Sequence, residues 1–514
     1  MSMLATTKDD LICMHIMTIR QAIAALAYQS QTSKRPIHSL LILLLCMISS
    51  TNTQAQELTR QLHDAHDTFK DSSFTHRRFK HRDIVPILQS LGGPLSVSQV
   101  GTSLEGRSIH QVQAGTGPIP VLLWSQMHGD EATATMALFD IFRFLQASND
   151  GFDEFRQTIL ANTSLYFVPM LNPDGAERFQ RRTSADIDMN RDALRLQSPE
   201  SVLLKRLQQT LKPLVGFNLH DQNPRYSVGN SGKQAVVSFL ATAYDPARHV
   251  NEVRKRSMQL IVGMNRVLQQ FIPGQVARYD DEFEPRAFGD NIQKWGTTLI
   301  LIESGGQVGD PEKMSIRRLN FVAILTALFA IATESYTAET ITDYQAIPEN
   351  TRSLFDLLIR NATVIRNGKP YTIDLGINHY EVNTDSARGF YYRSQIEDLG
   401  DLSTFHGLTE VDATSLTFAP VRVHATSLDS LGDLRKLDLA ALREEGVVAF
   451  RLRGKLKKDT VPKFPVHVVS EGKLPGRSPL IGQLPTFLLK QGSKIKYVFI
   501  NGFSDELAGN GVAE

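Results

Sequence analysis

The chain has 514 residues, of which 42% are hydrophobic and 21% are charged, and its formal net charge is +1. This length is enough for two or three domains, and the composition is typical of a soluble globular protein. The balanced charge produces no field toward nucleic acid or an anionic membrane, and no dense Lys/Arg run interleaved with aromatic residues is present, so no nucleic-acid partner is predicted.

The first segment in chain order, residues 1–55, is typical of a secretory signal peptide. Lys34 and Arg35 precede an apolar run over residues 40–48, and polar and small residues follow as far as Ala55. The apolar run is short for a membrane span. We therefore expect cleavage near Ala55, export to the periplasm or the medium, and no stable membrane insertion after the signal is removed. An uncleaved membrane anchor is the alternative, and the oligomeric state is not predicted.

Both cysteines of the chain, Cys13 and Cys46, lie in this leader. The mature chain would therefore contain no thiol, so it could form no disulfide and offer no cysteine as nucleophile or ligand. Any metal bound by the mature chain must be held by histidine and carboxylate side chains.

Residues 56–82 are expected to form a polar, helical lead-in, and residues 83–345 to form a domain in which strands alternate with helices. The strand-like apolar runs are Val121–Ser125, Leu165–Leu171, Leu214–Leu219, Val236–Ala241 and Thr298–Ile302. Apolar residues at helical spacing lie over 138–145, 202–211 and 258–268. This alternation predicts an α/β fold with a mixed, mostly parallel central sheet flanked by helices.

A boundary is predicted near residues 346–351, and residues 351–514 are expected to form a smaller, β-rich accessory domain. Strand-like runs over residues 364–366 and 371–377 flank Asn367-Gly368, which is a strong hairpin signal. One helical stretch is expected over residues 431–445. The histidines of this region are interpreted as ordinary residues: His379, His406, His424 and His467.

The sharpest motif is Met127-His128-Gly129-Asp130-Glu131, which follows a buried strand and opens a helix. A histidine and a glutamate three residues apart can face one ion, and a catalytic zinc takes three protein ligands and a water. Alone, the pair is better explained by a surface histidine and a glutamate favoured by a helix start. A third ligand is expected at another strand end, where His220 follows an apolar strand. Asp221 either orients His220 or is exposed.

Glu303 ends the apolar run over residues 299–302 and precedes Ser304-Gly305-Gly306. A carboxylate at the end of a fully apolar strand is costly to bury without a purpose. Near a metal it would be placed to take a proton from bound water. A solvated glutamate at the start of a turn is the alternative interpretation.

Three further motifs lie between these residues: Asn172-Pro173-Asp174-Gly175, Arg181-Arg182 and Asp188-Met189-Asn190-Arg191-Asp192. The first is a turn signal in its own right. Arginines near a zinc site can polarise a carbonyl or bind a carboxylate through two hydrogen bonds. A solvated charged surface is the alternative for both arginine motifs.

In this order, the pieces between about residues 75 and 335 resemble the zinc metallocarboxypeptidase family. The resemblance implies one Zn²⁺ per chain, held by His128, Glu131 and His220, and a water activated by Glu303. It implies that Asn190 and Arg191 hold the terminal carboxylate of a peptide substrate. It also implies that an arginine polarises the scissile carbonyl, for which Arg181 is the choice and Arg182 the near alternative.

The resemblance leaves specificity open. Tyr279 is the candidate for the mobile tyrosine of the family, and residues 280–290 are expected to line the specificity pocket. There Arg286 would suit an acidic substrate side chain and Asp290 a basic one. The sequence departs from the family pattern mildly at Met189 and Asp192.

The predicted function is hydrolysis of the C-terminal peptide bond by metal-activated water with a glutamate as general base. A zinc amidohydrolase of the same fold, acting on cell-wall peptides or N-acyl amino acids, is one alternative. A non-catalytic binding module with a decayed site is another. None of the ligands or the base of the family pattern is missing from the chain, which favours an enzyme.

Overall fold

The computed structural model describes residues 57–504, apart from 455, 457–462, 464, 471–475 and 477. The predicted leader, with Cys13, Cys46 and Ala55, lies outside the described residues. The chain divides into two compact units, residues 1–61 and 62–514. In the first unit, residues 57–61 are helical. In the second, residues 62–69 are helical, but residues 70–80 are turns and irregular backbone, so the lead-in is less helical than expected.

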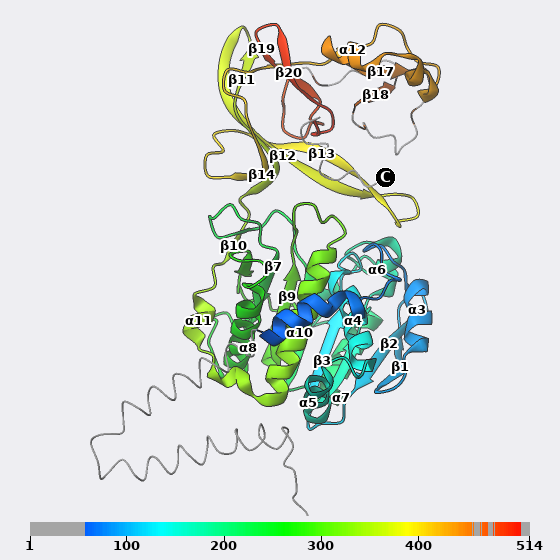
Figure 1. The fold of residues 1–514 in the computed structure, drawn as a ribbon, viewed down its shortest axis with the longest axis vertical. Coiled ribbons are helices and arrows are strands. Elements are labelled where there is room, and N and C mark those ends of the chain that lie inside the picture. The colour runs from blue at the N-terminus through cyan, green and yellow to red at the C-terminus, as the bar shows by residue number, and fades with distance from the viewer. Residues whose placement is uncertain are drawn as a thin grey trace, which may run out of the picture. The chain divides into compact units, whose positions relative to one another are not determined.

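A mixed eight-stranded sheet with the order β1-β2-β4-β3-β5-β9-β7-β8 forms the centre of the N-terminal part of the large unit (Figure 1). Its strands are β1 Leu95–Thr102, β2 Ser108–Ala114, β3 Ile119–Ser125, β4 Thr163–Val168, β5 Val215–Asp221, β7 Val237–Leu240, β8 Val276–Arg278 and β9 Thr298–Ser304. The central strands β4, β3, β5 and β9 pair in parallel, and β7 and β8 are also parallel. The predicted α/β fold with a mixed, mostly parallel sheet is confirmed.

Helices cover both faces of this sheet, which is why its central strands read as nearly continuous apolar runs. Helices α4 (Thr133–Gln146), α8 (Glu252–Leu268) and α10 (Met314–Thr333) pack together on one face (Figure 1). On the other face, α7 (Pro199–Leu211) and α9 (Phe288–Lys294) cover β3 and β9. There Trp124 and Leu299 share one core with Leu204 and Phe288. The remaining helices are α3 His81–Ser90, α5 Asp153–Asn162, α6 Pro173–Arg178 and α11 Ile341–Gln345.

Helix α10 is the apolar centre of its layer. Within the described residues it is the one helix long and apolar enough to cross a membrane, with a hydropathy of 1.6, and 67% of its apolar window is buried inside the protein. Its Arg317 donates to both carboxylate oxygens of Asp140 on α4 at 2.7 and 2.6 Å, and both side chains are fully buried. These contacts are those of a helix in a protein core.

The arrangement of β3, β5 and β9 positions the functional residues. The three strands are parallel neighbours, so their carboxyl ends meet at one edge of the sheet. His220 of β5 is the direct register partner of Glu303 on β9. The loop that contains His128 and Glu131 follows β3 at the same edge, because that strand ends at Ser125. Sites in open α/β sheets gather at this edge.

The C-terminal part of the large unit, from about residue 350, is β-rich, as predicted. A seven-stranded sheet has the order β13-β12-β11-β15-β19-β20, with β14 also paired to β11, and a three-stranded sheet contains β16, β17 and β18. The strands are β11 Leu354–Arg366, β12 Lys369–Asn383, β13 Phe390–Gly400, β14 His406–Asp412, β15 Thr417–Ala419, β16 Arg422–Val423, β17 Val447–Leu452, β18 His467–Ser470, β19 Phe487–Gln491 and β20 Lys494–Phe499.

The hairpin signal at Asn367-Gly368 is confirmed. Arg366 pairs with Lys369 across the turn, and the two turn residues have φ angles of 51° and 75°. Positive φ at both positions is the two-residue hairpin turn that this dipeptide favours. The predicted helical stretch over residues 431–445 is also found, as a 3₁₀ helix at Leu431–Lys436 and α12 at Leu439–Glu444. A short bridge between β6 (Ser227–Val228) and β10 (Asn350–Thr351) leads into this region.

Candidate metal centre

Three buried side chains converge at the carboxyl edge of the sheet: His128, Glu131 and His220. Their ligand atoms all lie within 4.8 Å of one another. Nδ1 of His128 is 2.8 Å from Oε1 of Glu131, Nδ1 of His220 is 2.6 Å from Oε2 of Glu131, and the two Nδ1 atoms are 3.2 Å apart. The sequence separation of 92 residues between the histidines is closed by the parallel pairing of β3 and β5.

This donor set fits zinc. Two imidazoles and one carboxylate are the ligands of many catalytic zinc sites, with a fourth position left for water. An ion about 2.0–2.1 Å from each nitrogen in tetrahedral geometry separates two ligand nitrogens by about 3.3 Å. The 3.2 Å between the Nδ1 atoms of His128 and His220 matches that separation.

The backbone around the cluster is tightly built. A side chain at Gly129 would lie 2.0 Å from the carbonyl carbon of Gly175 and 2.2 Å from the nitrogen of Ala176, so this loop needs glycine. Asn172 donates from Nδ2 to the carbonyl of Met127 at 3.2 Å and caps α6 by accepting from the backbone of Gly175 at 2.9 Å. The Asn172–Gly175 motif is therefore more than a turn, because it supports the loop that carries His128 and Glu131.

Asp188 orients His128. Nε2 of His128 donates to Oδ1 of Asp188 at 3.1 Å, which leaves Nδ1 facing Glu131 and His220. A carboxylate on the second ring nitrogen fixes the tautomer of a metal-binding histidine. Sequence reasoning gave Asp188 no role, although its place two residues before Asn190 and its carboxylate were the available signal.

Asp221 does not orient His220, and it is not exposed. Its Oδ2 accepts from Oγ1 of Thr133 at 2.6 Å and from Nζ of Lys313 at 2.9 Å, and its side chain is only 6% exposed. Its backbone nitrogen donates to Oε2 of Glu131 at 3.2 Å. Asp221 therefore supports Glu131 and α4, while Nε2 of His220 is buried with no hydrogen-bond partner in the described part of the chain.

Electrostatics distinguish the two histidines. Burial lowers the pKa of His220, which favours the neutral imidazole that binds metal. Burial also acts to lower the pKa of His128, but the carboxylates of Glu131 and Asp188 outweigh it and raise the pKa to about 9. Burial acts to raise the pKa of Glu131, and the two histidines outweigh it and hold that pKa well below its usual value.

Glu303 lies beside the cluster through its register with His220. It is partly buried, in contrast to the fully buried residues 298–302 before it. Burial, with the nearby charge of Glu131, raises the pKa of Glu303 well above its usual value. A raised pKa makes a carboxylate a stronger base than an ordinary glutamate.

Of the two neighbouring arginines, only Arg181 reaches the cluster. Its Nη1 lies 3.0 Å from Nδ1 of His128 and 3.3 Å from Oε1 of Glu131, and Nε and Nη2 bind Oδ2 of Asp188 at 3.1 and 3.0 Å. Arg182 is exposed and donates instead to the backbone of Asp186 at 2.8 Å. The structure therefore separates the two arginines between which the sequence left a choice.

Asn190 and Arg191 follow Asp188 in a 3₁₀ turn, Met189–Arg191. Oδ1 of Asn190 accepts from the backbone of Phe288 at 3.0 Å. Arg191 is partly exposed and forms an ion pair with Glu284, with Nε 3.2 Å from Oε2. The same glutamate binds Arg286 at 2.9 and 2.8 Å. Glu284 thus engages Arg191, a contact that sequence reasoning did not anticipate.

The other predicted substrate residues lie around this pair. Asp290 is buried on α9 and accepts from the backbone of Glu284 at 3.0 Å, and its burial raises its pKa to about 7. Arg286 is exposed and bound to Glu284. Tyr279 follows β8, and its hydroxyl is 3.5 Å from that of Tyr226. Burial, followed by the charge of Glu303, raises the pKa of Tyr279, so its phenol stays protonated.

Comparisons with known proteins identify the sequence family of this region. Residues 90–209 match the family model of zinc carboxypeptidases. The chain is 30% identical over 112 residues to carboxypeptidase D of Drosophila melanogaster, which covers 18% of this chain and 8% of that protein. It is 22% identical over 155 residues to probable carboxypeptidase 2 of Arthroderma benhamiae, covering 30% and 27%. The chain thus spans less than a third of the length of these relatives.

Similar solved structures include a metallo-carboxypeptidase from Pseudomonas aeruginosa in complex with (2-guanidinoethylmercapto)succinic acid, with 18% identity, coverage of 50% and 68%, and a TM-score of 0.40. Another is carboxypeptidase A from Helicoverpa armigera, with 16% identity, coverage of 55% and 81%, and a TM-score of 0.40. The family-model match covers His128, Glu131, Arg181, Asn190 and Arg191. The predicted resemblance is confirmed over residues 90–209, which match the zinc carboxypeptidase family model, and His220 and Glu303 lie outside that match.

Proposed function

We propose that this chain is a zinc-dependent metallocarboxypeptidase that hydrolyses the last peptide bond of a peptide. The observation that carries the proposal is the buried cluster of His128, Glu131 and His220, with their ligand atoms within 4.8 Å and Glu303 in register beside it. The zinc carboxypeptidase sequence match over residues 90–209 supports it. Peptides are the proposed substrates, and one zinc per chain is the proposed cofactor.

His128, Glu131 and His220 would hold the ion. When bound, zinc acts as a Lewis acid that polarises the scissile carbonyl and lowers the pKa of water. In the proposed reaction Asn190 and Arg191 bind the terminal carboxylate, and Arg181 donates to the carbonyl oxygen as negative charge develops there. Asp188 accepts from two guanidinium nitrogens of Arg181, and these contacts orient the guanidinium.

Glu303 moves the proton in this proposal. It takes a proton from the attacking water and delivers it to the nitrogen of the departing amino acid. Its pKa is raised above the usual value of a carboxyl group, which makes the carboxylate a stronger base than an ordinary glutamate.

The proposal is tested by incubating the purified chain, with and without a zinc chelator, with peptides that differ in their last residue. Released amino acids and shortened peptides are detected by mass spectrometry. Activity is expected to disappear with chelator, to return with zinc and to be absent in Glu303→Gln. Cleavage that resists chelation, or full activity in Glu303→Gln, would exclude this mechanism.

We also propose that the mature chain acts outside the cytoplasm after cleavage near Ala55, on the basis of the residue order of the leader. Expression of the full-length chain in a bacterial host, followed by N-terminal sequencing of periplasmic material, tests this. A mature N-terminus near Gln56 is expected. Full-length protein retained in the cytoplasm or the membrane would contradict it.

A further inference from the structure

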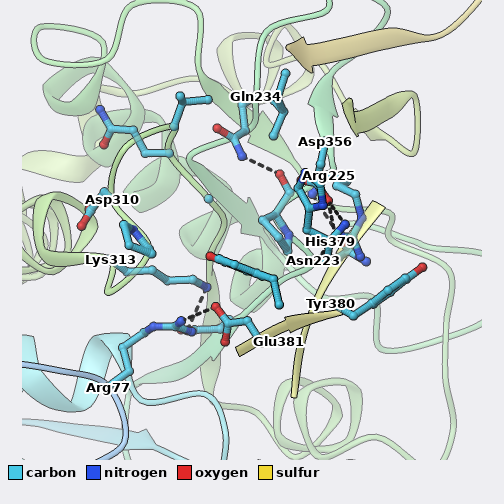
Figure 2. Close-up of a pocket in the computed structure, with 18 of the residues that line it drawn as sticks. Arg77, Asn223, Arg225, Gln234, Asp310, Lys313, Asp356, His379, Tyr380 and Glu381 are labelled. Carbon is cyan, nitrogen blue, oxygen red and sulfur yellow. Dashed lines mark hydrogen bonds and ion pairs between the residues drawn. The ribbon is translucent and has the colours of Figure 1, made fainter. Parts of the chain in front are cut away.

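A cavity of about 540 Å³ lies beside the metal-ligand cluster. Asp130, Glu131, Asp221 and Asn223 line it from the loops at the edge of the eight-stranded sheet. Side chains of the β-rich region line its other side, and among these His379, Tyr380 and Glu381 lie on β12 (Figure 2). The cavity therefore lies between Glu131, one of the three candidate metal ligands, and the β-rich region.

Ion pairs across the cavity hold these two walls together. Nη1 of Arg225 is 3.0 Å from Oδ2 of Asp356, and Glu381 accepts from Arg77 at 2.8 Å (Figure 2). Glu381 also accepts from Arg78 at 2.5 Å. The guanidinium of Arg78 is also sandwiched between the rings of Phe179 and Phe390, each with its centroid 4.2 Å away. Cation–π contacts of this kind strengthen an ion pair that is withdrawn from water.

These pairings leave an aromatic surface on the β-rich side of the cavity. Asp356 and Glu381 are paired with arginines. Four of the other side chains that line the cavity from the β-rich region are rings: His379, Tyr380, Tyr392 and Phe503, here called the aromatic wall. The rings of His379 and Phe503 stack at 4.4 Å, and Tyr392 lies 6.1 Å from each.

His379 is fixed as part of this wall. Its Nδ1 lies 2.6 Å from Oγ of Ser394, and that hydroxyl donates its own hydrogen to the carbonyl of Asn501. Nδ1 of His379 must therefore be the donor in the first of these bonds. With its ring held in this way and stacked on Phe503, His379 presents a fixed surface.

The position of the cavity indicates which part of a peptide it receives. Asn190 and Arg191, the proposed site for the terminal carboxylate, are not among its described lining residues, whereas Glu131 is. A peptide whose last residue lies at Arg191 and whose scissile bond lies at the metal ligands would continue into this cavity with its N-terminal part.

We propose that the β-rich region completes the substrate site, and that its aromatic wall binds an aromatic or large apolar side chain located upstream of the scissile bond. This inference rests on the proposed function, because it requires a peptide that crosses the metal ligands. It assigns to the β-rich region a direct part in selecting substrates.

Peptide binding tests the inference without requiring turnover. The full-length chain carrying Glu303→Gln is loaded with zinc and titrated by calorimetry with acetylated tetrapeptides that have a free carboxylate. Three peptides are compared, which differ only in the two residues that precede the last residue. One has alanine at both positions, and each of the other two has phenylalanine at one of them. One phenylalanine peptide is expected to bind about tenfold more tightly than the alanine peptide.

Tyr392→Ala and Phe503→Ala, each in the same background, are expected to reduce this preference to within about twofold. The control is Tyr371→Ala on β12 of the same β-rich region, where the side chain is 50% exposed and outside the cavity lining. This variant is expected to keep the preference. The inference is overturned if phenylalanine and alanine peptides bind equally, if none of them binds, or if both wall variants keep the preference. Failure of the proposed function would appear separately, as a wild-type chain that hydrolyses no peptide.

Discussion

The imidazoles of His128 and His220 present their Nδ1 atoms to each other at a distance of 3.2 Å, with one oxygen of Glu131 beside each nitrogen. Such an approach is favourable only when something shared lies between the nitrogens, such as a proton or a metal ion. Burial lowers the pKa of His220, which favours the neutral imidazole that binds metal. The carboxylate of Glu131, whose ligand atom lies within 4.8 Å of both nitrogens, completes a three-residue set that could hold a metal ion.

Replacing Asp188 by asparagine is expected to weaken zinc binding about 10- to 100-fold, because the carboxylate that holds the tautomer of His128 is lost. Asp186→Asn is the matched control, since that carboxylate is 89% exposed and has no contact with the cluster. Competition with a chromophoric chelator measures both affinities. Equal zinc affinity of the Asp188 and Asp186 variants would show that Asp188 does not support the site.

Arg181 and Arg182 are neighbours in sequence with different surroundings, which makes them a matched pair. Arg181→Ala is expected to lower kcat about 10²- to 10³-fold, because a donor to the developing oxyanion is removed. The side chain of Arg182 contacts Asp186 and not the cluster. The kcat of Arg182→Ala is therefore expected to stay within about twofold of the wild-type value. Steady-state kinetics on one peptide compares the two, and a larger loss in the Arg182 variant would reverse the assignment.

Glu284 forms an ion pair with the guanidinium of Arg191, the group that we propose binds the substrate carboxylate. The Glu284→Gln variant is expected to lower KM about three- to tenfold with little change in kcat, because a peptide carboxylate no longer competes with a protein carboxylate for Arg191. Glu282→Gln, an exposed neighbour, is the control and should leave KM unchanged. A raised KM in Glu284→Gln would instead indicate that Glu284 positions Arg191 for substrate.

Lys80 should make stability depend on pH in a defined window. Its ammonium group is buried and donates to the carbonyls of Glu177 at 2.7 Å and Ala387 at 2.8 Å, and burial lowers its pKa from 10.5 to about 8. Between these two values the unfolded chain binds more protons than the folded chain, so raising the pH favours folding.

Denaturant unfolding of the wild type and of Lys80→Met tests this. The free energy of unfolding of the wild type, minus that of the variant, is expected to increase from about pH 8 to about pH 10.5. A difference that is flat or decreases over this window would mean that Lys80 remains charged in the folded protein.

The central part of the fold could be predicted from sequence because β3, β5 and β9 are nearly continuous apolar runs, and such runs flanked by helical periodicity belong to a parallel sheet. The end of each run then located His128, His220 and Glu303. The edge strand β8, of only three residues, carries no such signal, and β1 is largely exposed.

The contacts that complete the site could not be predicted, because they join residues that are distant in sequence. Lys313 and Asp221 are 92 residues apart, and Arg77 and Glu381 are 304 residues apart. Which charges meet depends on how the loops and the β-rich region pack, and local periodicity contains no information on that packing. The ion pair of Arg191 with Glu284 could not be predicted for the same reason.

The most direct test of the central claim compares one peptide in two forms, with a free terminal carboxylate and with a terminal amide. The zinc-loaded chain is incubated with each, and the products are identified by mass spectrometry. We predict that the free peptide loses single residues from its C-terminus and that the amidated peptide is cut at least about 100-fold more slowly, because Arg191 has no carboxylate to bind. Equal cleavage of both forms, or cleavage at internal bonds, would contradict the assignment of a carboxypeptidase.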